Sequence, residues 1–144
     1  MNDILTLLDP VTGLLDRQGW QRFALGEEER CRRHGNVATV IVVRLEAEPS
    51  HNTLVAAAAA ARAGSRLHDL VARVSENELA VLATECPPDE AEAVAERLSA
   101  RLSEARVTHW IGVAGRHTSR DVLAALDEAG ARAGEAAEDL STLA

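Results

Sequence analysis

Three charged residues near the middle of the chain have the types and the spacing of a ligand-binding site. Arg66 and Asp69 are three positions apart, so a single turn of backbone can direct both side chains toward one bound group. A guanidinium offers paired N–H donors or stacks on a planar ring, whereas a carboxylate accepts hydrogen bonds from N–H groups. Arg97 could supply a second guanidinium, from the same chain or from a second copy. We predict a binding site at these three residues; an inert surface motif is the alternative.

Few other residues offer chemistry. All 15 basic residues are arginine, which excludes any lysine-based mechanism. Cys31 and Cys86 lack the spacing of metal ligands, and the five histidines are scattered along the chain. Trp20 and Trp110 are interpreted as core residues. The sequence therefore predicts neither a metal site nor a cofactor.

Length and charge narrow the class of protein. The chain has 144 residues, which suits one domain over 1–144. Its net charge of −8 argues against nonspecific binding to DNA or RNA, which requires a basic surface. Residues 1–8 lack the features of a signal peptide, and no apolar run approaches the ~18 residues of a membrane span. With two cysteines, a reducing compartment is expected. These features predict a cytoplasmic protein that binds neither nucleic acid nor membrane.

The first part of the chain is predicted to form a helix and then a buried strand. Residues 9–13 have the composition of a turn, after which Asp16 can cap a helix at 17–33. Residues 37–45 are a continuous apolar run rich in β-branched side chains. Such a run predicts a strand that is covered on both faces, at the centre of a sheet.

The rest of the chain alternates between helical and strand patterns. Asn52 or Thr53 is expected to cap a helix at 54–63, and Ser119 to cap the last helix. The other predicted elements are strands at 70–74, 79–84 and 107–114 and a helix that opens at 87–89.

This order of elements, with a hairpin loop at 75–78, predicts an α+β fold, an α/β sandwich. The expected architecture is a central mixed sheet of βαββαβ type with helices packed on it. A short lead at 1–8 and a fraying acidic tail at 135–144 are expected at the two ends.

Four segments, in the same order, resemble the GGDEF domain of diguanylate cyclases. Residues 9–17 (DPVTGLLDR) resemble the family's opening pattern D-x-L-T-G-L-x-N-R, and residues 37–46 stand where its first core strand belongs. Residues 70–79 (LVARVSENEL) resemble the strand and hairpin L-V-A-R-x-G-G-D-E-F, and residues 111–114 (IGVA) resemble the late strand S-I-G-V-A. The resemblance implies a fold like that of class III nucleotide cyclases, in agreement with the predicted order of elements.

The residues that the family's reaction requires are replaced. The resemblance implies the joining of two GTP molecules beside two metal ions that carboxylates hold. Where the family has D-x-D, this chain has Arg44-Leu45-Glu46, and a guanidinium repels Mg²⁺. The segment after this strand is short, and residues 134–139 lack the cations of the family's C-terminal pattern. The signature G-G-D-E-F appears as Ser75, Glu76, Asn77, Glu78 and Leu79, in which only Glu78 keeps a carboxylate of the family pattern.

Arg66, Asp69 and Arg97 resemble the family's product-binding inhibitory site. That site is R-x-x-D placed five residues before the signature, and five residues separate Asp69 from Ser75. A further arginine lies in an A-E-R-L pattern, where this chain has Arg97. The resemblance implies cyclic di-GMP as the ligand: Arg66 and Arg97 would bind or stack on guanine, and Asp69 would accept from its N–H groups.

The sequence therefore predicts a catalytically inactive GGDEF-like protein of bacterial signalling. In the leading hypothesis it is an effector that binds cyclic di-GMP at Arg66, Asp69 and Arg97 and forms a ligand-dependent dimer. In the alternative it is a pseudoenzyme that binds no nucleotide and acts by contacting an unidentified partner protein.

Overall fold

Strand β1 (Ala38–Leu45) is the centre of the computed structural model, which describes residues 4–143. All of its residues except Arg44 are buried, because helices cover both faces of the sheet. β1 pairs antiparallel with β3 (Glu78–Thr84) on one side and with β4 (His109–Gly115) on the other. β2 (Leu70–Ser75) pairs antiparallel with β3, so the strand order is β2-β3-β1-β4 and β2 is an edge.

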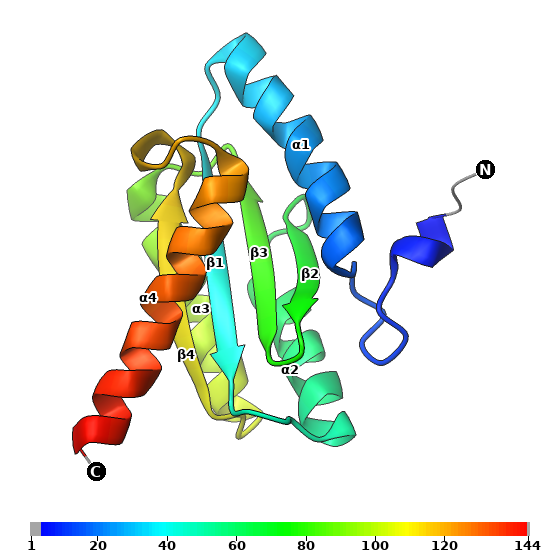
Figure 1. The fold of residues 1–144 in the computed structure, drawn as a ribbon, viewed down its shortest axis with the longest axis vertical. Helices are drawn as coiled ribbons and strands as arrows, with labels where there is room; N and C mark the ends of the chain where they lie inside the picture. The colour runs from blue at the N-terminus through cyan, green and yellow to red at the C-terminus, as the bar shows by residue number, and fades with distance from the viewer. Residues whose placement is uncertain (1–3, 144) are drawn as a thin grey trace.

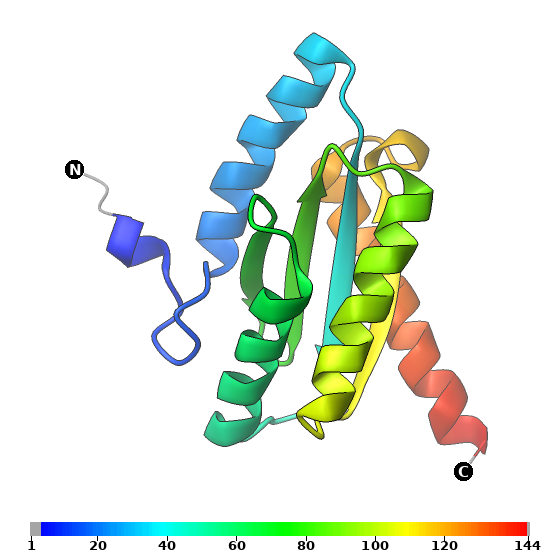
Figure 2. The same ribbon diagram turned by 180° about the vertical axis from the view of Figure 1, so that it is seen from behind.

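The helices form one layer on each side of the sheet, as Figures 1 and 2 show from opposite directions. Successive strand residues point to opposite faces, so Val40 and Val42 join the core under α1 and α4. Ile41 and Val43 join the core under α2 and α3. The helices are α1 (Arg17–His34), α2 (His51–Gly64), α3 (Pro88–Glu104) and α4 (Val122–Leu143).

The predicted α+β sandwich of βαββαβ order is confirmed, but the expected mixed sheet is antiparallel in all of its ladders. β1 and β2 run parallel on either side of β3, and β3 and β4 run parallel on either side of β1. The helix α2 connects β1 to β2, and β3 lies between these two strands. In the same way, α3 connects β3 to β4, and β1 lies between them. Parallel pairing in the described residues is limited to one isolated bridge, Leu15–Ala72. The order of elements along the chain does not reveal this placement.

Side-chain caps determine where the first two helices begin. The predicted cap of α1 is confirmed: Asp16 Oδ1 accepts from Gly19 N at 2.8 Å. The predicted caps of α2 are wrong, because Ser50 Oγ accepts from Thr53 N at 3.1 Å and the helix begins at His51. Asn52 already lies within the first turn of that helix, where its backbone is helical.

The last helix also differs from expectation at both ends. Asp121 Oδ1 accepts from Ala124 N at 2.8 Å and so takes the capping role predicted for Ser119. The Ser119 hydroxyl is buried without a hydrogen-bond partner in the described residues. The helix continues past Gly134 to Leu143, so it includes residues 135–143 of the tail that is expected to fray, and residue 144 lies outside the described residues.

The N-terminal lead forms a short 3₁₀ helix, Ile4–Leu7, and then the predicted turn. Asp9 Oδ2 accepts from both the backbone N–H and the hydroxyl of Thr12 at 2.8 Å. Gly13 follows with a φ of +72°, a conformation that favours glycine. Residues 1–3 of the predicted lead lie outside the described residues. Within 4–143, the helices lack the combination of length and apolar composition that crossing a membrane requires.

Candidate functional site: the Arg66–Asp69 corner

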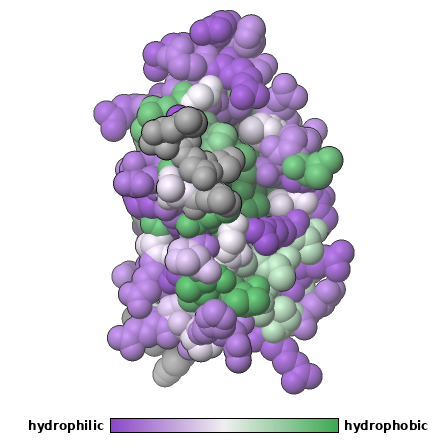
Figure 3. Space-filling model, turned by 90° about the vertical axis from the view of Figure 1, so that its right-hand side faces the viewer, coloured by the Kyte–Doolittle hydropathy of each residue, from purple (hydrophilic) through white to green (hydrophobic). Residues whose placement is uncertain are grey.

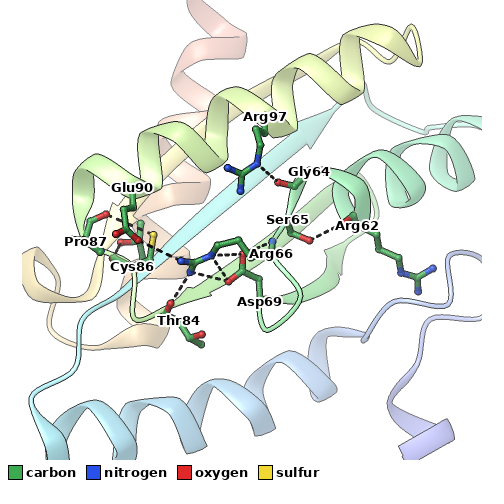
Figure 4. A network of polar contacts seen from close by, with 11 residues as sticks. Arg62, Gly64, Ser65, Arg66, Asp69, Thr84, Cys86, Pro87, Glu90 and Arg97 are labelled. Atoms are coloured by element: carbon green, nitrogen blue, oxygen red, sulfur yellow. Dashed lines mark hydrogen bonds and ion pairs between the residues drawn. The ribbon is translucent and has the colours of Figure 1, made fainter.

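Arg66 and Asp69 lie in the loop between α2 and β2, and they bind each other (Figure 4). Arg66 N donates to Asp69 Oδ2 at 2.8 Å, and Arg66 Nη2 donates to Asp69 Oδ1 at 3.0 Å. The Asp69 side chain is 0% exposed and that of Arg66 is 23% exposed. The hydrogen bonds to Asp69 raise the pKa of the Arg66 guanidinium above its ordinary value. The predicted pair is thus brought together, but the carboxylate is buried beneath the guanidinium instead of facing outward.

Two further groups contact Arg66 from different elements. Its Nη2 donates to the carbonyl of Thr84, the last residue of β3, at 2.7 Å. Its Nη1 lies 3.5 Å from Oε2 of Glu90, in the first turn of α3. The Glu90 side chain is 58% exposed, so this ion pair is the one that solvent weakens most. An incoming ligand group therefore meets Arg66 at the edge that Glu90 occupies.

Arg97 reaches from α3 toward the C-terminal end of α2 (Figure 4). Its Nε donates to the carbonyl of Gly64 at 3.2 Å. Gly64 allows this approach, because a Cβ at that position would lie only 3.0 Å from Leu98 Cα of α3. Arg97 is otherwise exposed. Each arginine is therefore held by a backbone carbonyl: Arg66 by that of Thr84 at the end of β3, and Arg97 by that of Gly64 at the end of α2.

Sequence reasoning missed Glu90 and Thr84 as neighbours of the site. Thr84 acts through its main-chain carbonyl, which any residue supplies, so the sequence carries no signal for it. Glu90 directly follows the predicted helix opening at 87–89, where the sequence gives it no role in the site. Its contact with Arg66 depends on how α3 packs beside the end of β3, which no local pattern reveals.

The signature segment forms a tight turn at the other end of the β2–β3 hairpin. Ser75 pairs directly with Glu78, so Glu76 and Asn77 alone make the turn and the predicted four-residue loop is wrong. Ser75 Oγ donates to Glu78 Oε1 at 2.8 Å. The Asn77 carbonyl accepts from Leu45 N at 2.8 Å, and Asn77 Nδ2 donates to the Leu45 carbonyl at 3.0 Å. The turn therefore closes onto the end of β1 through neutral groups.

This end of the sheet does not fit the pair of divalent metal ions that the GGDEF resemblance implies. Arg44 pairs across the strands with Glu78 and with Trp110, which places a cation on the surface where metal ligands are required. The Asn77 amide is turned toward a carbonyl. Leu79, the last residue of the signature, is fully buried in the core. Within residues 4–143 there is no group of three or more His, Cys, Asp and Glu side chains that could hold a metal ion.

Solved GGDEF domains share this fold. The diguanylate cyclase SiaD from Pseudomonas aeruginosa, solved with its activator SiaC, has a TM-score of 0.84 and 22% identity, covering 94% of this chain and 60% of that one. The FimX GGDEF domain from the same organism has a TM-score of 0.81 and 22% identity, covering 92% and 94%. The GGDEF domain of DgcB from Caulobacter crescentus, in complex with cyclic di-GMP, has a TM-score of 0.79 and 13% identity, covering 91% and 88%.

These likenesses define the fold of the chain. No protein-family model matches the sequence, and no curated protein matches it. The chain is a GGDEF-like domain by its fold, as the motifs at 9–17, 70–79 and 111–114 predicted. It spans about three-fifths of the SiaD chain and nearly all of the FimX domain.

Proposed function

We propose that this protein binds cyclic di-GMP without making it, through Arg66 and Arg97. The observation that supports this most is the way the two guanidiniums are held. Arg66 is fixed by Asp69 and by the Thr84 carbonyl, while its Nη1 edge faces only an exposed glutamate. Arg97 is fixed at Nε by the Gly64 carbonyl. Two anchored arginines with free edges suit guanine N7 and O6 acceptors and phosphate oxygens.

The proposal changes the role predicted for Asp69. In the arrangement described, the carboxylate cannot reach a guanine N–H group, because both of its oxygens bind Arg66 and its side chain is fully buried. We therefore assign Asp69 as a positioning residue that holds Arg66 in the orientation a ligand needs. Binding of cyclic di-GMP by the GGDEF domain of DgcB, which has the same fold, supports the choice of ligand.

The absence of synthesis is part of the same proposal. The reaction needs metal-binding carboxylates and a backbone that approaches the nucleotide closely. Arg44 replaces the first of these carboxylates, and Asn77 bonds the end of β1 instead of a metal ion. Ser75 places a side chain at the first glycine position and bonds Glu78 with it.

The ligand site is tested with a fluorescent cyclic di-GMP analogue, whose binding is followed by anisotropy. Arg97→Ala is expected to weaken binding by roughly tenfold or more, because a charge-assisted contact is lost. The matched control is Arg101→Ala, one helical turn further along α3, where the side chain is 53% exposed and pairs only with Glu104. Analytical ultracentrifugation with and without ligand tests ligand-dependent dimerisation. Equal affinity of the two variants would refute the assignment of Arg97.

The second candidate function is a protein-interaction module that binds no nucleotide. The observation that favours it is that the Arg66–Asp69 pair satisfies its own hydrogen bonds without a ligand. SiaD, which has the same fold, is solved with a protein activator. Saturable binding of the analogue by the unmodified protein would reject this candidate, whereas its absence at high micromolar ligand would favour it.

A further inference from the structure

A hollow of about 630 Å³ lies next to the Arg66–Asp69 corner, between the N-terminal turn, α1 and the α2–β2 loop. Figure 3 shows apolar side chains gathered on this face of the molecule. Arg66 and Asp69, which bind each other, form part of its lining. Its apolar lining residues include Leu8, Leu14, Leu15, Phe23, Leu67 and Leu70.

The hollow exists because only part of the edge strand β2 is covered. Leu15 covers one part, where its carbonyl accepts from Arg73 N at 2.8 Å. The other part, at Leu70 and Val71, faces the hollow. The turn that carries Leu15 is held in place by the ion pair between Asp9 and Arg73, at 3.2 Å. These two contacts attach the N-terminal turn to β2 beside the hollow.

Leu67 is the least expected side chain on this face. It is fully exposed, with a relative exposure of 104%, although its neighbours Arg66 and Asp69 are held by hydrogen bonds. Phe23 of α1 is 37% exposed on the opposite wall. Large apolar side chains around a concave apolar surface are typical of an interaction site.

The charge at the rim of the hollow is opposite to that of the whole chain. The net charge of the protein is −8, yet the hollow is lined by Arg62 and Arg66. Arg66 and the buried Asp69, the one acidic lining residue, neutralise each other, so Arg62 supplies the positive charge of the lining. The Arg62 side chain is exposed and forms no ion pair with the residues described. It points away from Arg66, toward the N-terminal segment (Figure 4).

We propose that this hollow binds an acidic amphipathic segment of a partner protein. Apolar side chains of the segment would enter the hollow beside Leu67 and Phe23, and its carboxylates would pair with Arg62 at the rim. The proposal provides the second candidate function with a surface, and it does not depend on cyclic di-GMP. Because Arg66 lines both sites, the segment and the dinucleotide would compete.

A second copy of this chain fits the hollow less well. Two copies that met through this face would bring the Arg62 side chains of both copies together, and like charges repel. The remaining large exposed apolar side chains of the described residues are single ones on separate elements: Leu25 on α1, Val37 before β1 and Val55 on α2. They do not form an apolar ridge that could fill the hollow.

The test uses two synthetic amphipathic helical peptides with the same leucine face, one with glutamate and one with arginine on the polar face. Binding to the full chain is measured by fluorescence anisotropy. The glutamate peptide is expected to bind saturably, and Leu67→Ser and Arg62→Glu are each expected to weaken it by roughly tenfold. Both side chains are exposed, so the variants should fold, which circular dichroism checks. The matched controls, Leu25→Ser and Arg101→Glu, are expected to leave binding unchanged.

Three results would overturn the proposal: no saturable binding of the glutamate peptide, equal binding of the two peptides, or an equal loss in the control variants. A dimer of the protein alone that Leu67→Ser dissociates would assign the hollow to a second copy and also overturn it. Titration of Arg62→Glu with cyclic di-GMP keeps the two proposals separate, because Arg62 is not part of the dinucleotide site.

Discussion

The two ends of strand β3 lie at two sites that the GGDEF resemblance marks, and the chain fills them differently. At the Glu78 end, the signature turn closes onto β1 through the Asn77–Leu45 hydrogen bonds, which involve no charge. At the Thr84 end, a buried carboxylate holds an arginine whose outer edge meets only an exposed glutamate. The first site is closed by neutral hydrogen bonds, whereas the second has a partly exposed charged group.

The two sites differ in how many elements of the fold contribute to them. The hydrogen bonds of the signature turn stay within the β2–β3 hairpin and the end of β1, so they do not involve the Thr84 end of β3. The Arg66 contacts come from the α2–β2 loop, β3 and α3, so this site cannot change without affecting how three elements meet. We therefore expect substitutions at the Arg66 corner to affect stability and binding more than substitutions at the turn.

Asp69→Ala should produce the largest effect. It leaves the Arg66 guanidinium and backbone N–H without their buried acceptor, and we expect a loss of about 2–4 kcal/mol in the free energy of unfolding. Urea denaturation measures it, with Glu96→Ala on the exposed face of α3 as the control. A loss no larger than that of the control would show that the pair has no structural role, and the contrast between the two sites would fail.

Arg66→Lys is expected to weaken cyclic di-GMP binding by roughly tenfold or more. Lysine keeps the charge but lacks the planar fork that can bind Asp69, the Thr84 carbonyl and a ligand together. Anisotropy with the fluorescent analogue measures the change, and Arg101→Lys serves as the control. An affinity within about twofold of the unmodified protein would mean that charge alone acts at this position.

Asn77→Asp tests the closed turn and should cost about 1 kcal/mol at neutral pH. The substitution replaces a donor to the Leu45 carbonyl by a carboxylate oxygen that faces it. The new carboxyl is therefore expected to have a raised pKa in the folded protein. Its protonated form can donate, so the loss should shrink as the pH falls toward about 4. Thermal melts at neutral pH and at about pH 4 measure the loss of stability, with Glu76→Ala as the control. A loss that does not depend on pH would contradict the assigned hydrogen bond between Asn77 and the Leu45 carbonyl.

Glu90→Gln should produce the smallest effect, in the opposite direction. Removing the ion pair at the outer edge of Arg66 is expected to strengthen cyclic di-GMP binding by roughly two- to fivefold. This fold-change corresponds to the free energy that an exposed ion pair contributes. The gain should decrease at high salt, because the interaction is screened. Glu92→Gln on the same helix is the control. Weaker binding in Glu90→Gln would show that Glu90 takes part in binding instead of competing with it.

The fold could be predicted from the sequence because its main signals are local. The apolar run of β1 predicted a strand buried on both faces, and Asp16 predicted the start of α1. The antiparallel sheet could not be predicted, because the order of elements does not say which strands become neighbours. Ser50 and Asp121 competed with equally good capping residues nearby, and only the structure shows which side chain meets a free N–H group.

The candidate site could be predicted only in part. The spacing of Arg66 and Asp69 predicted that both side chains point toward one bound group, whereas in the structure they bind each other. It could not show that the Asp69 side chain is buried, or that Arg66 contacts the Thr84 carbonyl and Glu90, both distant in sequence. The apolar hollow has no sequence signal, because Leu67 and Phe23 belong to different elements and only the fold brings them to one face.

The most direct test of the central claim is calorimetric titration of the unmodified protein with cyclic di-GMP, beside a titration with GTP and Mg²⁺ in which products are analysed by chromatography. We predict saturable heat with the cyclic dinucleotide and neither saturable heat nor product with GTP. No binding of cyclic di-GMP at high micromolar concentration, or any cyclic di-GMP formed from GTP, would contradict the account.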